Sequence, residues 1–575
     1  MVFILIILIM QDSVSLPSIE NPEEEANILL DISESDKVIP EVISWDYHKE
    51  SEVQVIESLW EDSGLEKWAK SLPITYGASE YIWNFIRNPT YDKSLLLARQ
   101  SSVKNMPSTI YDDLKTIKSY EKDVAWIFTM PPLKEAYPIS SLFPSYPIIN
   151  LINNMQYILD LFHIYRIFIM PLFNLITPIV TLFSPWFYIR KTLKLNISLK
   201  AYLEVIWKGL LYALSGDRKM GVKYISVIFY IFLYIYGLIQ SLEISKILYK
   251  IRNNLLTKLE NIRKFITASE RLISTLSVEN ITPFLYNYKI RPQIQLPSGI
   301  AGMYKILTDR KVQGHILCLL RVVYAIDISS SIRKLIDTKQ CVFSEYVDNK
   351  DTAIWNMGHV ILGKEQIRNP VSLNRSIIVT GPNAAGKTTY VRAICTNIIL
   401  GQSLGIICGS RGRINIVHGI GSFMRISDEL GISSLFEAET NRCADLIKQA
   451  EEFSKDNKKA IYFLDEPMHS TPPIEGSATS LAVIEHLGKL EGIRLLVTTH
   501  YHNLIELDKI PEFINVSMKA NNTDNGYTFP YKINKGASYQ CIALELLKEH
   551  NLPDNVVKRA IEVKNKICEV MINDC

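Results

Sequence analysis

The stretch that most constrains the fold is residues 376–392, which read SIIVTGPNAAGKTTYVR. An apolar run is followed by a glycine-rich turn and then by a helical pattern. The turn fits G-x-x-x-x-G-K-[ST] at Gly381, Gly386, Lys387 and Thr388, which is the pattern of a phosphate-binding loop. Glycines let several backbone N–H groups converge on one phosphate, and the start of the following helix adds partial positive charge. The sequence therefore predicts a strand–loop–helix unit that binds a nucleotide.

The residue types in this loop predict ATP and Mg²⁺ as its ligands. Lys387 would reach the β- and γ-phosphates, and the hydroxyl of Thr388 would ligate Mg²⁺. The residues assigned to ATP binding are Gly381, Pro382, Asn383, Ala384, Ala385, Gly386, Lys387, Thr388 and Thr389.

Two further apolar runs end in residues that suit nucleotide hydrolysis. Residues 460–466, AIYFLDE, have the Walker B pattern, in which Asp465 would hold Mg²⁺ and Glu466 would activate the attacking water as a general base. Residues 495–500, LLVTTH, end in His500, which either senses the γ-phosphate or has a structural role. The succession of βα units predicts a parallel sheet with helices on both faces and the nucleotide at the carboxyl ends of the strands.

Length and composition limit the number of domains and the kinds of binding surface and metal site that the chain can have. A chain of 575 residues is long enough for three or four domains. The formal net charge of +2 means that any DNA-binding surface would have to be local. The eight cysteines contain no C-x-x-C pair, which argues against structural zinc and against a disulfide framework, and suits a reducing compartment.

The N-terminal part divides into two predicted segments. Residues 1–59 form an apolar start and a polar lead-in, and the run MVFILIILIM is either the core of a signal peptide or a stretch that touches a membrane. Residues 60–135 show apolar positions three and four residues apart and are predicted to be one part of a helical core.

Residues 145–245 form an apolar insert with two candidate membrane spans, 167–189 and 224–242. Aromatic residues lie near their ends, as in membrane-interface belts, although three prolines interrupt the first run. Buried core helices are the alternative. The connecting stretch is strongly basic, and the positive-inside rule would place it in the cytoplasm, which would put the ATPase on the wrong side of a two-span hairpin. The spans are therefore either re-entrant or interfacial, or the charge rule is overridden.

The remaining chain is predicted to hold a second helical part and the nucleotide domain. Residues 246–350 form a helical lever and core part that begins within a long amphipathic helix at 243–280. The basic residues of this helix are either a solvated face or an edge that faces DNA or lipid. Residues 351–535 are the predicted α/β P-loop ATPase domain, and a helical tail follows at 536–575.

Several of these segments together resemble the ATPase domain of MutS-family proteins, over residues 369–565. The segments that carry the resemblance are GPNAAGKTTYVR, GQSLGIICGSRGRI, RISDELGISSLFEAE, DEPMHSTPPIEG, TTHYHNLIEL and KGASYQCIALELLKEHNLPDNVVKRA. The family's signature has a serine, a phenylalanine two residues on and a glutamate five residues on, and Ser434, Phe436 and Glu439 fit it. The resemblance implies an ABC-like P-loop ATPase domain of MutS type behind a mostly α-helical core and lever region.

The resemblance also implies partners and further site residues. In the family the site is composite, so Ser434 would approach the γ-phosphate held by a partner subunit, and Tyr531 would stack on adenine. Residues 536–575 would be a helix–turn–helix that braces a homodimer or a MutS-like heterodimer. DNA would be the macromolecular partner, and DNA repair or recombination through an ATP-driven dimeric clamp the function.

Some residues depart from the family pattern. Ala384 and Ala385 replace the usual Met-Gly, and Pro-Met-His follows the Walker B carboxylates in place of Ile-Gly-Arg. Residues 1–130 contain no F-x-E wedge, so no chemistry for reading mismatches is visible. A membrane-associated ABC-type ATPase in transport or membrane remodelling is the alternative, although the LSGGQ signature is missing, and a scaffold with an inactive site is a third hypothesis. Every hypothesis with an active site places the ATPase domain on the nucleotide-containing side of any membrane.

Overall fold

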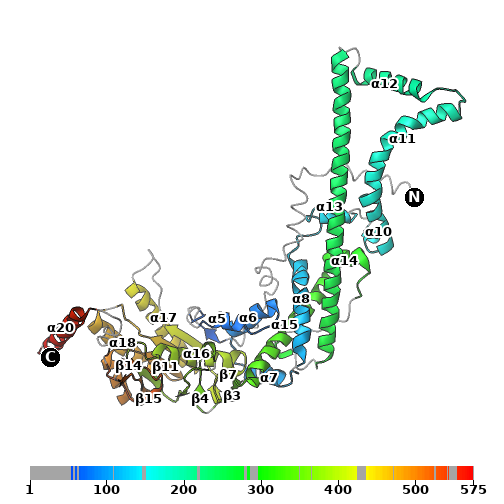
Figure 1. Cartoon of the computed structure of the whole chain (residues 1–575). Helices are drawn as coiled ribbons and strands as arrows, with labels where there is room; N and C mark the ends of the chain where they lie inside the picture. Colours follow the sequence, from blue (N-terminus) through cyan, green and yellow to red (C-terminus); the bar gives the residue numbers. More distant parts are fainter. Residues whose placement is uncertain are drawn as a thin grey trace. The chain divides into compact units, whose positions relative to one another are not determined.

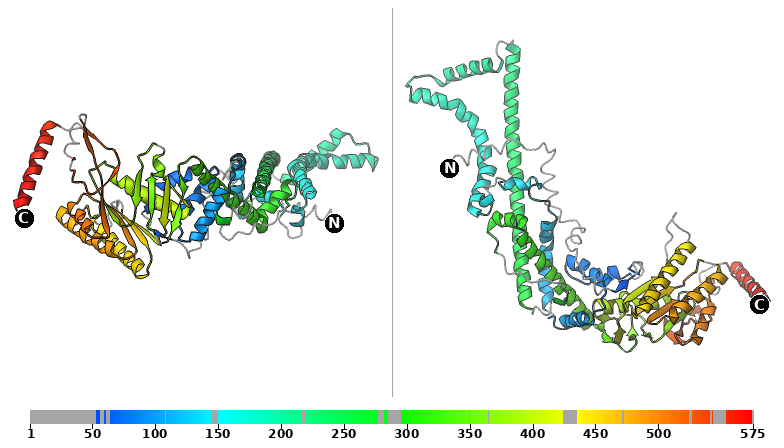
Figure 2. Two further views of the ribbon diagram at one scale, coloured as in Figure 1. Left: turned by 90° about the horizontal axis from the view of Figure 1, so that it is seen from below. Right: turned by 180° about the vertical axis from the view of Figure 1, so that it is seen from behind.

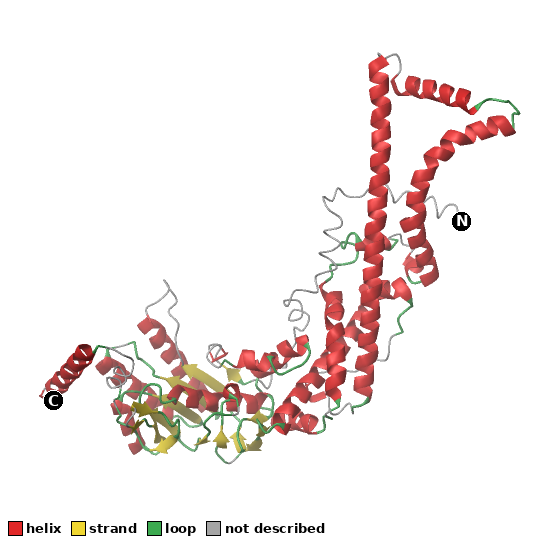
Figure 3. Ribbon diagram, viewed as in Figure 1, coloured by secondary structure: helices red, strands yellow, loops and turns green. Residues whose placement is uncertain are grey.

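The computed structural model describes residues 53–573 except 56–58, 61–63, 108, 145–149, 216–219, 277–281, 285–294, 349, 364, 424–434, 471, 524–525, 541 and 543–552. The described chain divides into two compact units (Figure 1). Unit 1 draws on residues 116–270 and 295–320, and unit 2 on residues 53–115, 271–284 and 321–573. The helices α8 (Ile110–Thr129), α13 (Met220–Ser274) and α15 (Arg310–Asp337) contribute residues to both. The described strands, yellow in Figure 3, all belong to unit 2.

Unit 1 is helical and is built along α13. Its other elements are η3 (Ile139–Leu142), α9 (Asn150–Asn153), α10 (Gln156–Ile164), the π-helical η4 (Tyr165–Ile169), α11 (Met170–Lys191), α12 (Leu199–Ser215) and α14 (Gly299–Thr308). The helix α10 and the start of α11 run beside α13, the rest of α11 bends away from it, and α12 lies near the N-terminal end of α13, as both Figure 1 and the right view of Figure 2 show.

The C-terminal half of α13 is the amphipathic helix that the sequence predicts. Its buried apolar positions recur at three- and four-residue spacing, as a helix with one buried face requires. They are Leu248, Ile251, Leu255, Leu259, Ile262 and Phe265. Two of its basic residues pair inside the unit, because Lys258 Nζ lies 2.9 Å from Asp123 Oδ1 and Arg252 Nη2 lies 2.9 Å from Asp160 Oδ1. Both ion pairs lie within unit 1.

Much of α11 and of the N-terminal half of α13 is apolar and exposed. Gln156–Lys191 and Ile231–Ser274 are long and apolar enough to cross a membrane, and in each only 6% of the most apolar 18-residue window is buried. Arg310–Asp337 also meets the criteria of length and composition, but 89% of its window is buried, which makes it a core helix of the protein. The alternative that the insert consists of buried core helices therefore does not hold for the side chains described in α11 and in the upper part of α13.

Unit 2 contains a seven-stranded sheet in the order β1-β9-β10-β11-β6-β12-β15. Its strands are β1 (Gln54–Val55), β6 (Ser376–Thr380), β9 (Gly419–Phe423), β10 (Ala460–Asp465), β11 (Ile493–Thr498), β12 (Phe513–Met518) and β15 (Ile533–Lys535). All neighbours pair in parallel except β12 and β15. Parallel strands are buried on both faces, which explains the nearly continuous apolar runs in β6, β10 and β11.

Helices cover both faces of this sheet, as the sequence predicts. Alternate residues of β10 point to opposite faces. Tyr462 and Leu464 belong to a core cluster with residues of α17 (Leu435–Lys455) and α18 (Pro473–Lys489). Ile461 and Phe463 point the other way and are also buried, and α16 (Lys387–Ser403) contacts β10 and β11 outside that cluster.

Smaller elements complete unit 2. A four-stranded sheet has the order β3-β8-β4-β5, β2 pairs with β7, and β13 pairs with β14. Their bounds are β2 (Val342–Phe343), β3 (Glu345–Val347), β4 (Ala353–Met357), β5 (Asn369–Ser372), β7 (Ile406–Ile407), β8 (Arg411–Asn415), β13 (Asn521–Thr523) and β14 (Gly526–Thr528). The remaining elements are α5 (Leu65–Lys70), α6 (Tyr76–Arg87), α7 (Lys93–Lys104), η6 (Thr282–Phe284), η7 (Val360–Leu362), η8 (His502–Lys509) and α20 (Asp554–Asn573).

The helices α5 to α7 belong to the same compact unit as the sheet. Arg99 on α7 donates from Nη1 to Ser403 O at 2.5 Å, and Gln100 donates from Nε2 to Gly405 O at 2.8 Å. The buried carboxylate of Asp327 on α15 accepts hydrogen bonds from the amide and the hydroxyl of Thr75, both at 2.7 Å, where α6 begins. An acceptor there satisfies amides that the helix itself leaves unpaired.

Candidate nucleotide site

The phosphate-binding loop lies between β6 and α16, where its backbone is strongly curved. Gly381 has φ 144° and Gly386 has φ 95°, and a Cβ at Gly381 would come within 2.1 Å of Met518 O. Only glycine fits Gly381 because both its conformation and its surroundings exclude a side chain. Ala384, one of the two departures from the family pattern in this loop, has φ 64°, while Ala385 is buried. The loop leads into α16 at Lys387, so the first amides of that helix have no intrahelical acceptor.

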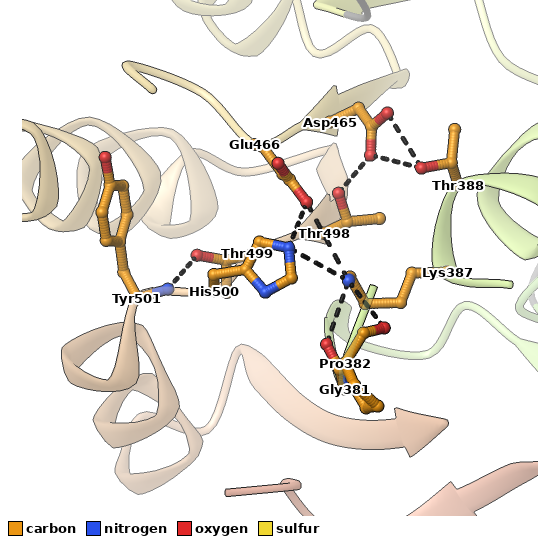
Figure 4. A network of polar contacts seen from close by, with 10 residues as sticks. All are labelled: Gly381, Pro382, Lys387, Thr388, Asp465, Glu466, Thr498, Thr499, His500 and Tyr501. Carbon is orange, nitrogen blue, oxygen red and sulfur yellow. Dashed lines mark hydrogen bonds and ion pairs between the residues drawn. The ribbon is translucent and has the colours of Figure 1, made fainter. Parts of the chain in front are cut away.

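Lys387 is buried inside the curve of this loop (Figure 4). Its Nζ donates to Gly381 O at 3.0 Å and to Pro382 O at 3.3 Å. Burial lowers the pKa of Lys387 from its usual value, and the carboxylates of Glu466 and Asp465 act in the opposite direction. The loop therefore concentrates positive charge and amide donors in one place, as binding a phosphate chain requires.

Asp465 and Thr388 face each other at the end of β10. The hydroxyl of Thr388 donates to Asp465, with both carboxylate oxygens 3.0 Å away. The hydroxyl of Thr498, at the end of β11, also donates to Asp465 Oδ1. Hydroxyl and carboxylate oxygens are the hard ligands that Mg²⁺ prefers. The residues present thus fit the metal site that the sequence predicts at Thr388 and Asp465.

Glu466 and His500 form a second group of polar contacts, which includes Lys387. His500 Nε2 lies 2.7 Å from Glu466 Oε1 and 3.3 Å from Lys387 Nζ, and Lys387 Nζ lies 3.9 Å from Glu466 Oε1. Hydrogen bonding to His500 holds the pKa of the Glu466 carboxyl below its usual range, so Glu466 is ionised at neutral pH. Its backbone has φ 51°, a conformation that non-glycine residues rarely adopt and that often marks functional sites.

A cavity of about 730 Å³ lies beside the loop and is large enough for a nucleotide. Residues 382–389, Glu466 and Tyr531 line it, so the residue expected to stack on adenine shares the cavity with the phosphate-binding loop. The Tyr531 ring is half exposed, and its carbonyl accepts a hydrogen bond from Asn369 Nδ2 at 2.8 Å.

A second part of the cavity wall was not predicted from the sequence. It extends from the end of β4 to the start of β5 and consists of Met357, Gly358, His359, Leu362, Glu365, Gln366, Ile367 and Asn369. Burial lowers the pKa of His359 to about 4, so this wall carries a neutral imidazole. The mixture of apolar and amide side chains suits a base and a ribose better than a second phosphate. The sequence analysis found no motif in this segment.

The signature residues are described only in part. Ser434 lies outside the described residues. Glu439 on α17 is fully buried, and its carboxylate lies 2.8 Å from His469 Nδ1 and accepts a hydrogen bond from Ser470 Oγ at 2.5 Å. The signature helix is thereby joined to the segment that directly follows Glu466.

The parallel sheet, the loop at the carboxyl end of β6 and the paired carboxylates after β10 define a P-loop nucleotide-binding domain. Sequence comparison narrows this class, because residues 377–568 match the family described as MutS domain V. Related proteins named DNA mismatch repair protein MutS include those of Acetivibrio thermocellus, 29% identical over 258 residues, and Clostridium perfringens, 29% identical over 278 residues. The protein of that name from Streptococcus pyogenes is 26% identical over 259 residues.

These alignments cover 43%, 45% and 43% of this chain, respectively, and 29%, 30% and 30% of the relatives. The similarity to MutS proteins therefore lies in the C-terminal part of this chain, at residues 377–568. The matched segment spans less than a third of the length of these relatives.

Proposed function

We propose that this chain is a MutS-like, Mg²⁺-dependent ATPase that binds DNA and acts in DNA repair or recombination. The observation that supports it best is the mutual contact of Lys387, Thr388, Asp465, Glu466 and His500, because three of them, Lys387, Thr388 and Glu466, line one nucleotide-sized cavity. These residues come from three strand ends of one sheet, which is where open α/β sheets bind ligands.

Each side chain has a defined part in the proposed hydrolysis. Lys387 and the loop amides hold the β- and γ-phosphates, and Thr388 and Asp465 hold Mg²⁺, which neutralises charge on the phosphate oxygens when bound. Glu466, ionised beside His500, accepts the proton of the attacking water, and His500 orients that carboxylate and faces the γ-phosphate. Tyr531 stacks on the adenine.

The DNA half of the proposal is tested by ATP hydrolysis with and without DNA. MutS-like coupling predicts that duplex, mismatched or branched DNA changes the rate, because ATP and DNA binding bias the same conformational equilibrium through the helical parts 60–135 and 246–350. The measurement is steady-state phosphate release at several salt concentrations, paired with DNA binding by fluorescence anisotropy. If no DNA structure binds or alters the rate, DNA is not the partner.

A composite dimeric site is the second element of the proposal. Ser434 of each subunit would complete the site that contains Lys387 of the other, and residues 536–575, which include α20, would brace the pair. We expect Lys387→Ala and Ser434→Ala each to be inactive alone. After subunit exchange between the two variants, half of the dimers would be mixed and each would contain one intact site, so activity should return to about one quarter of wild type.

The same mixture distinguishes a composite site from a site within one subunit. If Lys387 and Ser434 of one chain served the same nucleotide, every site in a mixed dimer would carry a defect and no activity would return. Phosphate release by the mixture, with size-exclusion chromatography to establish the dimer, provides the measurement.

The alternative, membrane-associated ATPase is favoured by one specific observation, the exposed apolar surface of α11 and α13. Phe173, Ile179, Phe232 and Ile235 are each exposed by about half of their surface or more. Water-exposed apolar side chains on this scale are typical of an interaction or lipid surface. The exposed lysines Lys200 and Lys208 on α12 suit contact with anionic headgroups, which agrees with an interfacial α12 between two inserted helices.

Binding to vesicles tests the membrane alternative. The wild-type chain is expected to float with vesicles of phosphatidylcholine and phosphatidylglycerol. A double variant, Ile179→Arg with Ile235→Arg, should lower binding by about 100-fold or more, because arginine near the centre of a span costs about 2.5–3.5 kcal/mol at each position. Ile474→Arg alters an isoleucine of α18 that is 75% exposed, and should leave flotation unchanged. A wild-type chain that stays in the soluble fraction without detergent would remove this alternative.

A further inference from the structure

Cys341 and Cys408 lie opposite each other beside the short β2–β7 ladder. In its antiparallel register Val342 faces Ile407 and Phe343 faces Ile406. The register continued by one residue places Cys341 opposite Cys408. Both thiols are buried, with 2% and 3% of each residue exposed.

The ladder also fixes which type of pair the two cysteines form. Ser344 N donates to Gly405 O at 3.1 Å, so 344 and 405 form a hydrogen-bonded pair. Hydrogen-bonded and non-hydrogen-bonded pairs alternate along an antiparallel ladder, so 341 and 408 are a non-hydrogen-bonded pair. The Cα atoms of such pairs are about 4.5 Å apart, within the roughly 4.4–6.8 Å that disulfides span.

The backbone contacts agree with this assignment. Cys341 N donates to Leu335 O at 3.2 Å, and Cys408 N donates to the Asn397 side chain at 2.6 Å, so neither amide is used across the ladder. The two thiols lie close enough that each shifts the pKa of the other. The side chains therefore point toward each other.

The surroundings make the two sulfurs chemically unequal. The neighbouring Cys341 thiol lowers the pKa of the Cys408 thiol, and so does Arg368, whose Nη1 lies 4.0 Å from Cys408 Sγ. The neighbouring Cys408 thiol and burial raise the pKa of Cys341. The thiolate is the reactive form of cysteine, so Cys408 would react with an oxidant first and Cys341 second.

Hydrogen bonds join this cysteine pair to a residue that lines the nucleotide cavity. Cys408 O accepts from Gly358 N at 2.8 Å, and Gly358 O accepts from Asn397 Nδ2 at 2.9 Å. Gly358 lines the cavity, and Asn397 belongs to α16, the helix that begins at Lys387. A displacement of Cys408 toward Cys341 would therefore shift the cavity wall relative to the phosphate-binding loop.

We propose that Cys341 and Cys408 form a redox-active dithiol, which hydrogen peroxide oxidises to a disulfide that weakens nucleotide binding in the adjacent cavity. The Cys408 thiolate attacks one peroxide oxygen, the O–O bond breaks, and Cys408 sulfenic acid and one water form after proton uptake. The Cys341 thiol then attacks the sulfenic sulfur, the S–S bond forms, and the S–O bond breaks to release a second water. The two thiols lose two electrons, which the peroxide gains. The effect on nucleotide binding rests on the proposed function, whereas disulfide formation does not.

Disulfide mapping tests the bond itself. The full chain is treated with hydrogen peroxide, the remaining thiols are alkylated, and linked peptides are identified by mass spectrometry. We expect a Cys341–Cys408 linkage in the wild type and in Cys318→Ser, which removes another buried cysteine. In Cys341→Ser, a sulfenic-acid probe should label Cys408, whereas in Cys408→Ser Cys341 should stay unlabelled. If no linkage forms in wild-type protein whose fold is intact, the proposal is wrong.

Binding of a fluorescent ATP analogue tests the consequence. The oxidised wild type should bind about five-fold more weakly or worse than the reduced protein, and dithiothreitol should restore the affinity. Cys341→Ser should show no such change after the same treatment. Unchanged affinity in protein with a mapped disulfide would overturn the coupling. If the reduced protein binds no nucleotide, the proposed function fails while the mapping still decides whether the bond forms.

Discussion

Glu466→Gln is expected to lower kcat for ATP hydrolysis by about 100-fold or more while ATP still binds, because glutamine cannot accept a proton from the attacking water. Glu466 is ionised at neutral pH and contacts both His500 and Lys387. Glutamine keeps the size of the side chain and one acceptor oxygen. The phosphate-binding loop and the contact between Thr388 and Asp465 do not depend on this residue.

Phosphate release under saturating ATP and equilibrium nucleotide binding, measured on the same preparation, check this expectation. Glu506→Gln is the matched control, because Glu506 lies exposed on η8 and pairs with Lys509 away from the cavity. A Glu466→Gln variant that hydrolyses ATP at the wild-type rate would remove Glu466 from the role of general base.

Lys387→Ala should reduce nucleotide affinity and hydrolysis together, each by about 100-fold or more, because the loop loses the cation that neutralises the β- and γ-phosphates. Lys387 Nζ is held inside the loop by Gly381 O and Pro382 O, so it meets the phosphates at little cost in side-chain entropy. The two variants thus separate binding from chemistry, since Glu466→Gln keeps ATP and Lys387→Ala loses it.

Titration with a fluorescent ATP analogue measures the loss of affinity in Lys387→Ala. Lys509→Ala removes an exposed lysine of the same unit and should bind as the wild type does. Circular dichroism of both variants shows whether the fold is kept. Wild-type affinity in a folded Lys387→Ala variant would place the nucleotide elsewhere.

The sequence predicted the α/β domain because its signals are local. The loop at 381–388 needs its glycines for backbone geometry, and the strands β6, β10 and β11 are apolar because both sheet faces are buried. Strand ends of a parallel sheet meet at one edge, so chain order alone indicated that Asp465, Glu466 and His500 would approach the loop. Their mutual distances and the left-handed backbone of Glu466 needed the structure.

Other features depend on contacts between distant parts of the chain. The edge strand β1 has two residues and pairs with β9 more than 360 positions away, in a stretch whose sequence resembles a polar lead-in. The cavity wall before β5 carries no recognised motif, so the sequence did not indicate that this segment would line the site. The carboxylate of Asp327 reaches the start of α6 across 252 positions. Sequence patterns indicate local periodicity but not which segments meet.

The pairing of Cys341 with Cys408 also depends on a contact between distant parts of the chain. The cysteine count and the lack of a C-x-x-C pair argued against a disulfide framework and gave no sign that Cys341 and Cys408 would lie together. The pair becomes visible only through the register of β2 and β7, because the two residues are 67 positions apart in the sequence.

The most direct test of the central claim, that this cavity binds and hydrolyses ATP with Mg²⁺, is phosphate release by the purified full chain. Release is measured with Mg²⁺ and with chelator, with and without DNA, and beside Lys387→Ala. We predict Mg²⁺-dependent release that the variant loses. Release no greater than that of Lys387→Ala under all of these conditions would contradict the account.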